Sequence, residues 1–219
     1  MGADELPCHA VLFDCDGVLV DSDASVTRAW RRWAEAYGLD PQTVPSMVHG
    51  RRASDSVAQL IGADDRERAL ATINAYELDD APQVTAVAGA RDLIMSVPDG
   101  RRAVVTSGSK ALATARLRAA GIDPPPVLIT ADDIAEGKPA PDGYLQAAAA
   151  LGVQPADAVV LEDSRAGVEA ARSAGAGAVV GVGPAAAGSS ADVVVADLRG
   201  VRWTGSGLRI TGASVAGDP

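Results

Sequence analysis

The sequence lacks the long apolar runs of membrane proteins, the many cysteines of disulfide-rich proteins and the excess positive charge of nucleic-acid-binding proteins. Lysine and arginine number 19 against 29 aspartates and glutamates, and the net charge of −10 argues against nucleic acid or an anionic membrane as the main partner. Two cysteines cannot form a disulfide framework, so a reducing cytosol is the simplest setting. No apolar run approaches the length of a bilayer span, and residues 1–7 lack the core of a signal peptide. We therefore expect a cytoplasmic protein with no nucleic-acid or membrane partner.

Histidine and aromatic residues are scarce as well. The two histidines are His9 and His49, and there is no Gly-x-Ser-x-Gly segment, so a hydrolase of the Ser-His-Asp type is poorly supported. Aromatic residues make up 3% of the chain, so a core must consist mainly of alanine, valine, leucine and isoleucine. The 47% apolar content over 219 residues is enough for one α/β domain with an insertion. The pattern contains no extended apolar interface, and a monomer is expected.

What the chain does contain is an alternation of short valine-rich runs with helical patterns, on both sides of residues 21–87. Such an alternation predicts a parallel sheet that is covered by helices on both faces. The predicted fold class is α/β, with a Rossmann-like parallel sheet core formed by residues 1–20 and 88–219. The expected strands are residues 10–13, 102–106, 127–129, 158–161, 178–182 and 192–195.

Residues 21–87 show helical periodicity with no strand pattern, which predicts an inserted α-helical cap domain. One helix is expected where large apolar side chains recur at i, i+4, i+7 and i+11: Val26, Trp30, Trp33 and Tyr37. Two further helices are expected at residues 54–61 and 64–78. Near the C-terminus, residues 201–210 predict a small hairpin, and the tail from Gly212 is expected to be loose.

Two carboxylates follow the first predicted strand. Residues 10–13 form an apolar run, and Asp14 and Asp16 come directly after it with one residue between them. Carboxylates at the end of a buried strand are costly unless something pairs with them. Mg²⁺ is the obvious partner because it prefers hard oxygen ligands. The segment therefore predicts a Mg²⁺-assisted phosphoryl-transfer site.

Polar groups of complementary kinds follow the other strands, whose carboxyl ends are expected at the same edge of the sheet. Ser107 and the Gly108 N–H stand at a helix start, which suits a phosphate. Lys138 follows the predicted strand at residues 127–129 after a long connection and brings positive charge to the phosphoryl oxygens. Glu162 and Asp163 come at the end of the predicted strand at residues 158–161 and add oxygen ligands for the metal.

These groups together can transfer a phosphoryl group. Asp14 can attack phosphorus in line and form an aspartyl phosphate. Asp16 can protonate the leaving oxygen and then deprotonate the water that hydrolyses the intermediate. Each group alone is common in loops and helix caps, but their order and their positions at strand ends make the combination specific. The expected partner is a small-molecule phosphate ester.

Four segments carry a family resemblance: FDCDGVLVDS, VVTSGS, ITADDIAEGKPAPDGYL and LEDSRAGVEAA. Through them, over roughly residues 11–182, the chain resembles the haloacid dehalogenase-like superfamily, in its sugar-phosphatase and β-phosphoglucomutase-like branch with a helical cap. The resemblance implies Asp14 as nucleophile, Asp16 as general acid/base, and Ser107 and Lys138 as phosphate-binding residues. It also implies a Mg²⁺ site whose ligands are Asp14, Asp16 and Asp163, with Glu162 in or just outside the coordination shell. The helical insertion corresponds to a mobile cap that closes over the substrate.

Departures within the family narrow the expected reaction. Dehalogenases of this fold lack the second aspartate, so Asp16 favours phosphate esters. Mutases of the branch carry a histidine where Val26 stands and an arginine near Ala53. The absence of both favours a sugar or polyol phosphatase. The alternative is a phosphosugar mutase. A signalling receiver module has a similar set of residues, but its Lys-Pro pair comes last, whereas here Lys138 precedes Glu162.

The loop after the first cap helix resembles that of bacterial sugar-phosphate phosphatases and of yeast-type glycerol- and deoxyglucose-phosphate phosphatases. In those enzymes the corresponding loop faces the active site. We therefore expect His49 and Arg51, or the neighbouring Arg52, to contact hydroxyls or phosphate of the substrate. The alternative is that they are ordinary surface residues between two helices.

Overall fold

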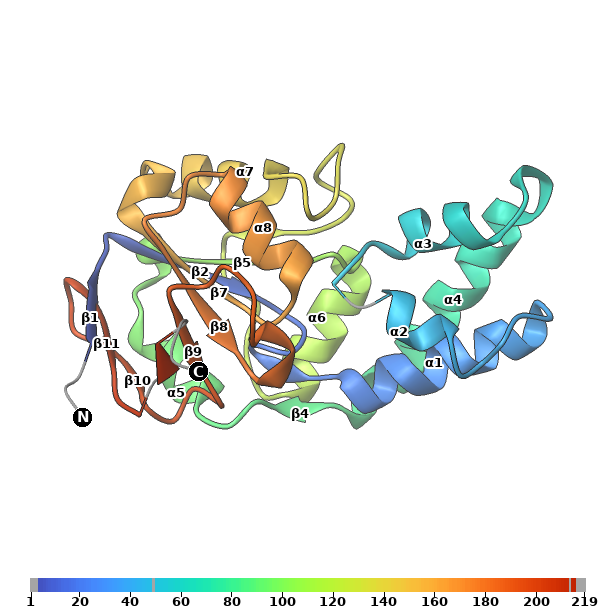
Figure 1. Cartoon of the computed structure of the whole chain (residues 1–219), viewed down its shortest axis with the longest axis horizontal. Helices are drawn as coiled ribbons and strands as arrows, with labels where there is room; N and C mark the ends of the chain where they lie inside the picture. The colour runs from blue at the N-terminus through green and yellow to red at the C-terminus, as the bar shows by residue number, and fades with distance from the viewer. Residues whose placement is uncertain (1–3, 49, 213, 216–219) are drawn as a thin grey trace.

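The structure is a computed structural model that describes residues 4–48, 50–212 and 214–215. A larger lobe built on a parallel sheet adjoins a smaller lobe of helices (Figure 1). The sheet order is β12-β9-β8-β7-β2-β5-β6, with six parallel strands and β12 antiparallel to β9, which confirms the predicted α/β fold. The strands are β2 (Ala10–Asp14), β5 (Arg102–Val105), β6 (Leu128–Ile129), β7 (Ala158–Glu162), β8 (Ala178–Val182), β9 (Val193–Val195) and β12 (Ser214–Val215).

The register of the central strands brings the predicted site residues to one edge. Strand β2 lies between β5 and β7, with Asp14 beside Val105 and Phe13 beside Leu161. Asp14 and Glu162 therefore end two adjacent parallel strands at the same edge of the sheet. Every residue of β2 and β7 is buried, as expected for strands covered on both faces.

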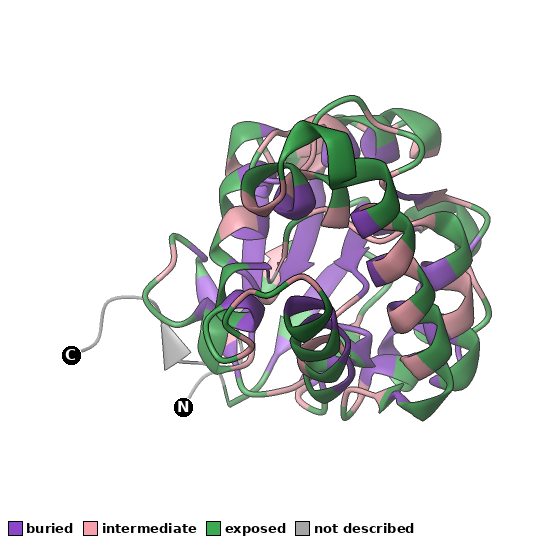
Figure 2. Ribbon diagram, turned by 90° about the vertical axis from the view of Figure 1, so that its right-hand side faces the viewer, coloured by how far each residue is buried: buried purple, intermediate pink, exposed green. Residues whose placement is uncertain are grey.

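Alternate side chains of β2 point into two separate cores, because successive residues of a strand face opposite sides. Val11 and Phe13 belong to a core with α5 and α6, whereas Ala10 and Leu12 belong to a core with α7 and α8. Figure 2 shows the buried strands between helices whose outer faces are exposed. The four helices are α5 (Ala90–Ser96), α6 (Lys110–Ala119), α7 (Asp142–Leu151) and α8 (Arg165–Ser173).

The helical lobe has a core of its own. Its helices are α1 (Asp23–Ala36), α2 (Val44–Val48), α3 (Ala53–Leu60) and α4 (Arg66–Asp80). Trp33 is fully buried at the centre of this core, and Val57 and Ile73 belong to it as well. The Trp33 Nε1–H donates to the Ala69 carbonyl at 2.8 Å, which joins α1 to α4. The predicted cap thus consists of a compact helical cluster, and its boundaries at residues 21 and 87 stay a prediction.

The expectation that residues 21–87 contain no strand is wrong at both ends. Strand β3 (Val20–Asp21) pairs antiparallel with β4 (Thr85–Ala86), so the chain enters and leaves the helical lobe through two adjacent strands. Each strand has only two residues, which is too short for an alternation of apolar and polar side chains to be visible in the sequence.

A second, antiparallel sheet lies at the end of the larger lobe farthest from the helical lobe (Figure 1). The predicted hairpin is confirmed as β10 (Val201–Trp203) and β11 (Gly207–Ile210), and β1 (Asp4–Pro7) adds a third strand that the pattern did not predict. The expectation of a loose tail is wrong for Ser214–Val215, which pairs with β9. Among the described residues, no helix has the length and apolar character needed to cross a membrane.

Candidate active site between the sheet and the helical lobe

Lys138 joins the two carboxylates that end strands β2 and β7. Its Nζ atom lies 2.7 Å from Oδ1 of Asp14 and 2.5 Å from Oε1 of Glu162. The three side chains are almost completely enclosed, with relative exposures of 7%, 5% and 0% for Lys138, Asp14 and Glu162. Burial alone would lower the pKa of Lys138, but the two carboxylates raise it above its usual value. The lysine is therefore a fixed positive charge beside the predicted nucleophile.

Glu162 has hydrogen-bond partners on both of its oxygens. Besides the lysine, Oε1 accepts from the Tyr144 hydroxyl at 2.6 Å. Oε2 accepts from the backbone N–H groups of Asp163 and Ser164 at 3.1 and 3.2 Å and from the Ser164 hydroxyl at 3.2 Å. Helix α8 packs so closely on Glu162 that a Cβ atom on Gly167 would lie 1.8 Å from Oε1. These contacts hold Glu162 in one position.

Three carboxylates come close enough to hold a cation. Asp14, Glu162 and Asp163 each offer an oxygen, and these atoms lie within 4.8 Å of one another. Burial raises the pKa of Asp14 well above its usual value, and Lys138 only partly opposes the rise. Burial, together with the charge of Glu162, also raises the pKa of Asp163 to about 7. One lysine does not neutralise three carboxylates, and an all-oxygen set fits a hard divalent cation such as Mg²⁺.

Asp16 faces the helical lobe and is held on one oxygen. The Ser22 hydroxyl donates to Oδ1 at 2.7 Å, and Nη1 of Arg116 donates to the same atom at 3.1 Å. Nη2 of Arg116 lies 3.4 Å from Oε1 of Glu77, which belongs to α4 of the helical lobe. Burial raises the pKa of Glu77, and Arg116 opposes this rise. One buried guanidinium thus connects Asp16 to the predicted cap.

The turn that is predicted to bind phosphate lies between β5 and α6, and its polar groups have partners within the protein. The Ser107 hydroxyl donates to the Gly50 carbonyl of the helical lobe at 3.1 Å. The Gly108 N–H donates to Oγ1 of Thr106 at 3.0 Å. In this conformation a cap loop therefore lies directly on the turn.

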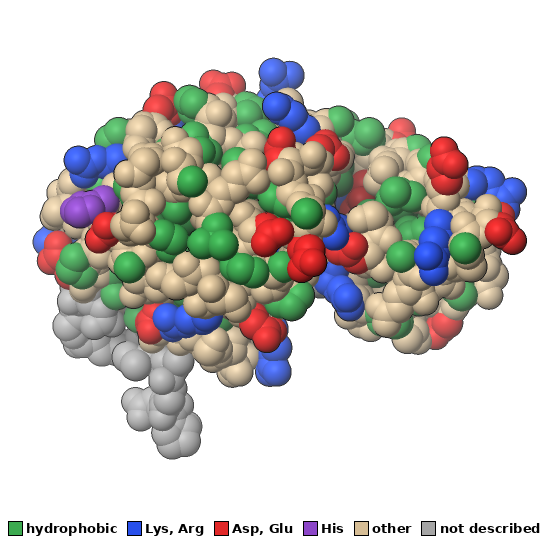
Figure 3. All heavy atoms as spheres, turned by 90° about the horizontal axis from the view of Figure 1, so that it is seen from above, with side chains coloured by type: hydrophobic (Ala, Val, Ile, Leu, Met, Phe, Trp, Pro, Cys, Tyr) green, Lys and Arg blue, Asp and Glu red, His purple; other side chains and the backbone are tan. Residues whose placement is uncertain are grey.

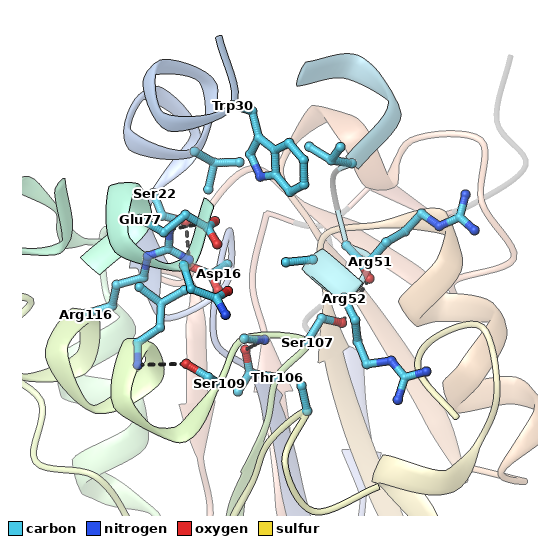
Figure 4. A pocket seen from close by; sticks show the side chains of 18 of the residues that line it. Asp16, Ser22, Trp30, Arg51, Arg52, Glu77, Thr106, Ser107, Ser109 and Arg116 are labelled. Carbon is cyan, nitrogen blue, oxygen red and sulfur yellow. Dashed lines mark hydrogen bonds and ion pairs between the residues drawn. The ribbon is translucent and has the colours of Figure 1, made fainter. Parts of the chain in front are cut away.

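One cavity of about 220 Å³ lies between the lobes, and its lining includes Asp14, Asp16, Asp163, Ser107, Gly108 and Arg116. Figure 4 shows Trp30 on one side of it, Ser107 on the opposite side, and a cluster of Asp16, Glu77 and Arg116 beside them. Figure 3 shows acidic and basic side chains gathered at the surface where the two lobes meet. The volume is below the roughly 300 Å³ at which pockets for drug-sized ligands begin, so the cavity fits a small substrate.

The cap loop contributes to the cavity and to the contact between the lobes. His49, one of its predicted substrate contacts, lies outside the described residues. Arg51 is exposed, and Figure 4 shows its side chain extending outward from the cavity. Nε and Nη2 of Arg52 donate to Asp55 at 2.9 and 3.0 Å, and Nη1 donates to the Ala135 carbonyl of the larger lobe at 2.9 Å. Substrate contacts by His49 and Arg51 remain a prediction.

The comparisons with known proteins agree with this geometry. A family profile of haloacid dehalogenase-like hydrolases matches residues 8–175. The chain belongs to the haloacid dehalogenase-like hydrolases. The chain is 39% identical over 173 residues to hexitol phosphatase A of Escherichia coli. The match covers 77% of the chain and 80% of that relative. Validoxylamine A 7'-phosphate phosphatase of Streptomyces hygroscopicus is 38% identical over 209 residues, and the match covers 88% of the chain and 95% of that relative.

A solved structure extends the likeness to the three-dimensional fold. The β-phosphoglucomutase of Clostridium difficile superposes with a TM-score of 0.77 and 25% sequence identity, covering 87% of this chain and 92% of that one. Both branches of the predicted resemblance, the phosphatases and the mutases, are therefore represented among the proteins similar to this hydrolase.

Several residues of the site were missed from the sequence. Gly167 carried a signal, because a glycine inside a helix costs up to about 1 kcal/mol relative to alanine and calls for a packing reason. Gly17 has a positive φ, and a Cβ atom there would lie 2.1 Å from Oδ2 of Asp163. Arg116 and Glu77 gave no signal, because charged residues on predicted helices usually face solvent.

Proposed function

We propose that this hydrolase is a Mg²⁺-dependent phosphatase of a small phosphorylated sugar or polyol, acting through an aspartyl phosphate. The observation that carries the proposal is the buried contact of Lys138 with Asp14, a residue that lines a small cavity with many polar side chains. The two curated relatives described above, which are phosphatases by name, support the same reaction class. A cytoplasmic location and a monomeric state remain predictions.

The carboxylates supply a ligand set for the metal. We assign the metal contacts to Asp14, the backbone carbonyl of Asp16, and Asp163. Glu162 already has partners on both oxygens, so its role is to hold Lys138 and the start of α8 just outside the coordination shell. When bound, Mg²⁺ would neutralise charge on the carboxylates and on the phosphoryl oxygens.

The protein groups then divide the work of phosphoryl transfer. Asp14 attacks phosphorus, and Lys138 reduces the repulsion between this carboxylate and the anionic ester. Ser107 and the Gly108 N–H exchange their present bonds to Gly50 and Thr106 for bonds to phosphoryl oxygens.

Asp16 moves the protons. It gives a proton to the leaving oxygen as the ester bond breaks, and it takes one from the water that hydrolyses the aspartyl phosphate. The helical lobe covers both steps and limits the access of bulk water.

The cationic groups around the cavity favour hydrolysis over a mutase reaction. A mutase must hold a second phosphate near the cap while the first is at Asp14. Arg52 is already bound to Asp55 and to the larger lobe, and Arg116 lies between two carboxylates. Val26 lines the cavity at the position where the resemblance places a histidine in mutases, and Ala53 lines it near the position of the mutase arginine.

Phosphate release over a panel of sugar, polyol and nucleotide monophosphates, with Mg²⁺ and with EDTA, tests the proposal. We expect a sugar or polyol phosphate to have the highest kcat/KM and EDTA to silence the enzyme. An enzyme that releases no phosphate but isomerises a glucose phosphate, as followed by ³¹P NMR, would be a mutase. Release from nucleotides alone would contradict the substrate class.

A further inference from the structure

Arg116 is buried in helix α6 although it carries a full charge, with a relative exposure of 2%. Its guanidinium lies between carboxylates of different lobes, 3.1 Å from Oδ1 of Asp16 and 3.4 Å from Oε1 of Glu77. Helix α6 also contacts α4, the helix that carries Glu77. A single side chain therefore joins the proposed acid/base residue to the cap.

The contacts of Asp16 fix the orientation of its carboxyl group. Within the described chain, the side-chain hydrogen bonds from Ser22 and Arg116 both end on Oδ1. Two donors on one oxygen set the plane of the carboxyl group and leave Oδ2 out of both bonds. Oδ2 is thus the oxygen that can meet the leaving group, and a displacement of about 1 Å in such a group costs on the order of 10²-fold in rate.

Stability alone does not explain this arrangement. Nε of Arg116 is buried, and no hydrogen-bond partner for it exists in the described part of the chain. A buried unpaired donor costs about 1–3 kcal/mol, and buried ion pairs contribute little net stability. A side chain that keeps an unpaired donor in order to reach two carboxylates is typical of a functional site.

We propose that Arg116 is a positioning residue for Asp16 and that Glu77 anchors Arg116 from the cap. The inference rests on the proposed function, in which Asp16 protonates the leaving oxygen. The proton moves from Oδ2 of Asp16 to the ester oxygen as the bond from that oxygen to phosphorus breaks and the bond from Asp14 forms. Arg116 keeps its protons throughout. Because Glu77 belongs to α4, Asp16 is fully oriented only while the cap lies on the core.

Two aryl phosphates test the role without any contact to sugar hydroxyls. Phenyl phosphate has a poor leaving group that depends on protonation, whereas p-nitrophenyl phosphate has a good one that depends on it far less. kcat/KM reports the first irreversible step, in which the leaving group departs. The ratio of the two kcat/KM values from one preparation does not depend on how much of the enzyme is folded. The variants are Arg116→Met, Arg116→Lys and, as the control, Arg118→Met, an exposed residue of the same helix.

We expect Arg116→Met to lower the phenyl to p-nitrophenyl ratio about tenfold or more, within the roughly 10²–10⁴-fold that acid/base catalysis contributes. Arg116→Lys should recover part of the ratio, because an ammonium reaches one carboxylate but lacks the planar fork that spans two. Arg118→Met should keep the wild-type ratio. An unchanged ratio in Arg116→Met, with both substrates slowed equally, would overturn the proposal and leave Arg116 with a structural role.

Glu77 supplies the second test. Glu77→Gln should lower the same ratio, and adding it to Arg116→Met should lower it no further, because the two residues act in one chain of contacts. Fully additive effects would contradict the anchoring role. A loss confined to sugar phosphates, with an unchanged aryl ratio, would show that Arg116 binds hydroxyls instead. These aryl results are separate from the sugar-phosphate panel, on which the substrate class depends.

Discussion

The ammonium of Lys138 lies 2.7 Å from Oδ1 of Asp14, and both side chains are buried at the carboxyl end of the central sheet. The same ammonium lies 2.5 Å from Glu162, which is itself fixed by Tyr144 and by the start of α8. The lysine therefore has two functions. It opposes the rise that burial causes in the pKa of Asp14, and it prepares the enclosed site for an anionic ester.

Replacement of this lysine should stop the reaction. Lys138→Met leaves the buried carboxylates of Asp14 and Glu162 without their cation, so we expect turnover of the best phosphate ester to fall by more than about 10²-fold. Lys110→Met, which changes an exposed lysine on α6, is the matched control and should retain activity. Near-wild-type turnover in Lys138→Met, in a protein whose circular dichroism is unchanged, would contradict the role of this contact.

The close packing of α8 on Glu162 predicts the effect of a single methyl group. In Gly167→Ala the new Cβ atom would lie 1.8 Å from Oε1 of Glu162, so the helix or the carboxylate must move. We expect a loss of about 1–3 kcal/mol in the free energy of unfolding, together with reduced turnover. Gly62→Ala has no atom within 4 Å of its Cβ and should be nearly neutral. Equal stabilities for the two variants would argue against this packing.

The raised pKa of Asp163 predicts how the stability of the metal-free protein depends on pH. Its folded pKa of about 7 lies above the ordinary value of 3.8, so the fold favours the protonated carboxyl. That stabilisation is present below about pH 4 and is lost as the pH rises through about 7. Mg²⁺ competes with this proton, so it should raise Tm more at pH 8 than at pH 5. Thermal melts with Mg²⁺ and with EDTA measure both effects, and an equal Mg²⁺ shift at the two pH values would contradict them.

The cap loop gives a prediction about substrate preference. If His49 and Arg51 contact the substrate, His49→Ala and Arg51→Ala should raise KM for sugar phosphates or change the order of preference over the panel. Arg31→Ala, an exposed change on α1, should do neither. Unaltered profiles for both loop variants would assign these two residues to the protein surface.

The sequence was informative where chemistry and local pattern coincide. Asp14, Lys138 and Glu162 could be placed together because each follows a predicted strand, and parallel strands bring such residues to one edge. The helical lobe was visible through its apolar periodicity, as with Trp33.

Contacts between distant segments were not predictable in this way. Arg116 lies 100 positions after Asp16 and 39 after Glu77, and its helical segment gives no local reason for burial. The pairing of β1 with β11 is invisible for the same reason, because β1 has only four residues and its partner lies near the other end of the chain. Such features depend on the completed fold, which no periodicity records.

In the proposed reaction Asp14 carries the phosphoryl group. Phosphate release from p-nitrophenyl phosphate in Mg²⁺, compared between the wild type and Asp14→Asn at equal concentrations of folded protein, is the sharpest test of this role. We predict turnover by the wild type, no detectable release by Asp14→Asn, and the same circular dichroism spectrum for both. Substantial release by Asp14→Asn would contradict the account, because the nucleophile would then be another group.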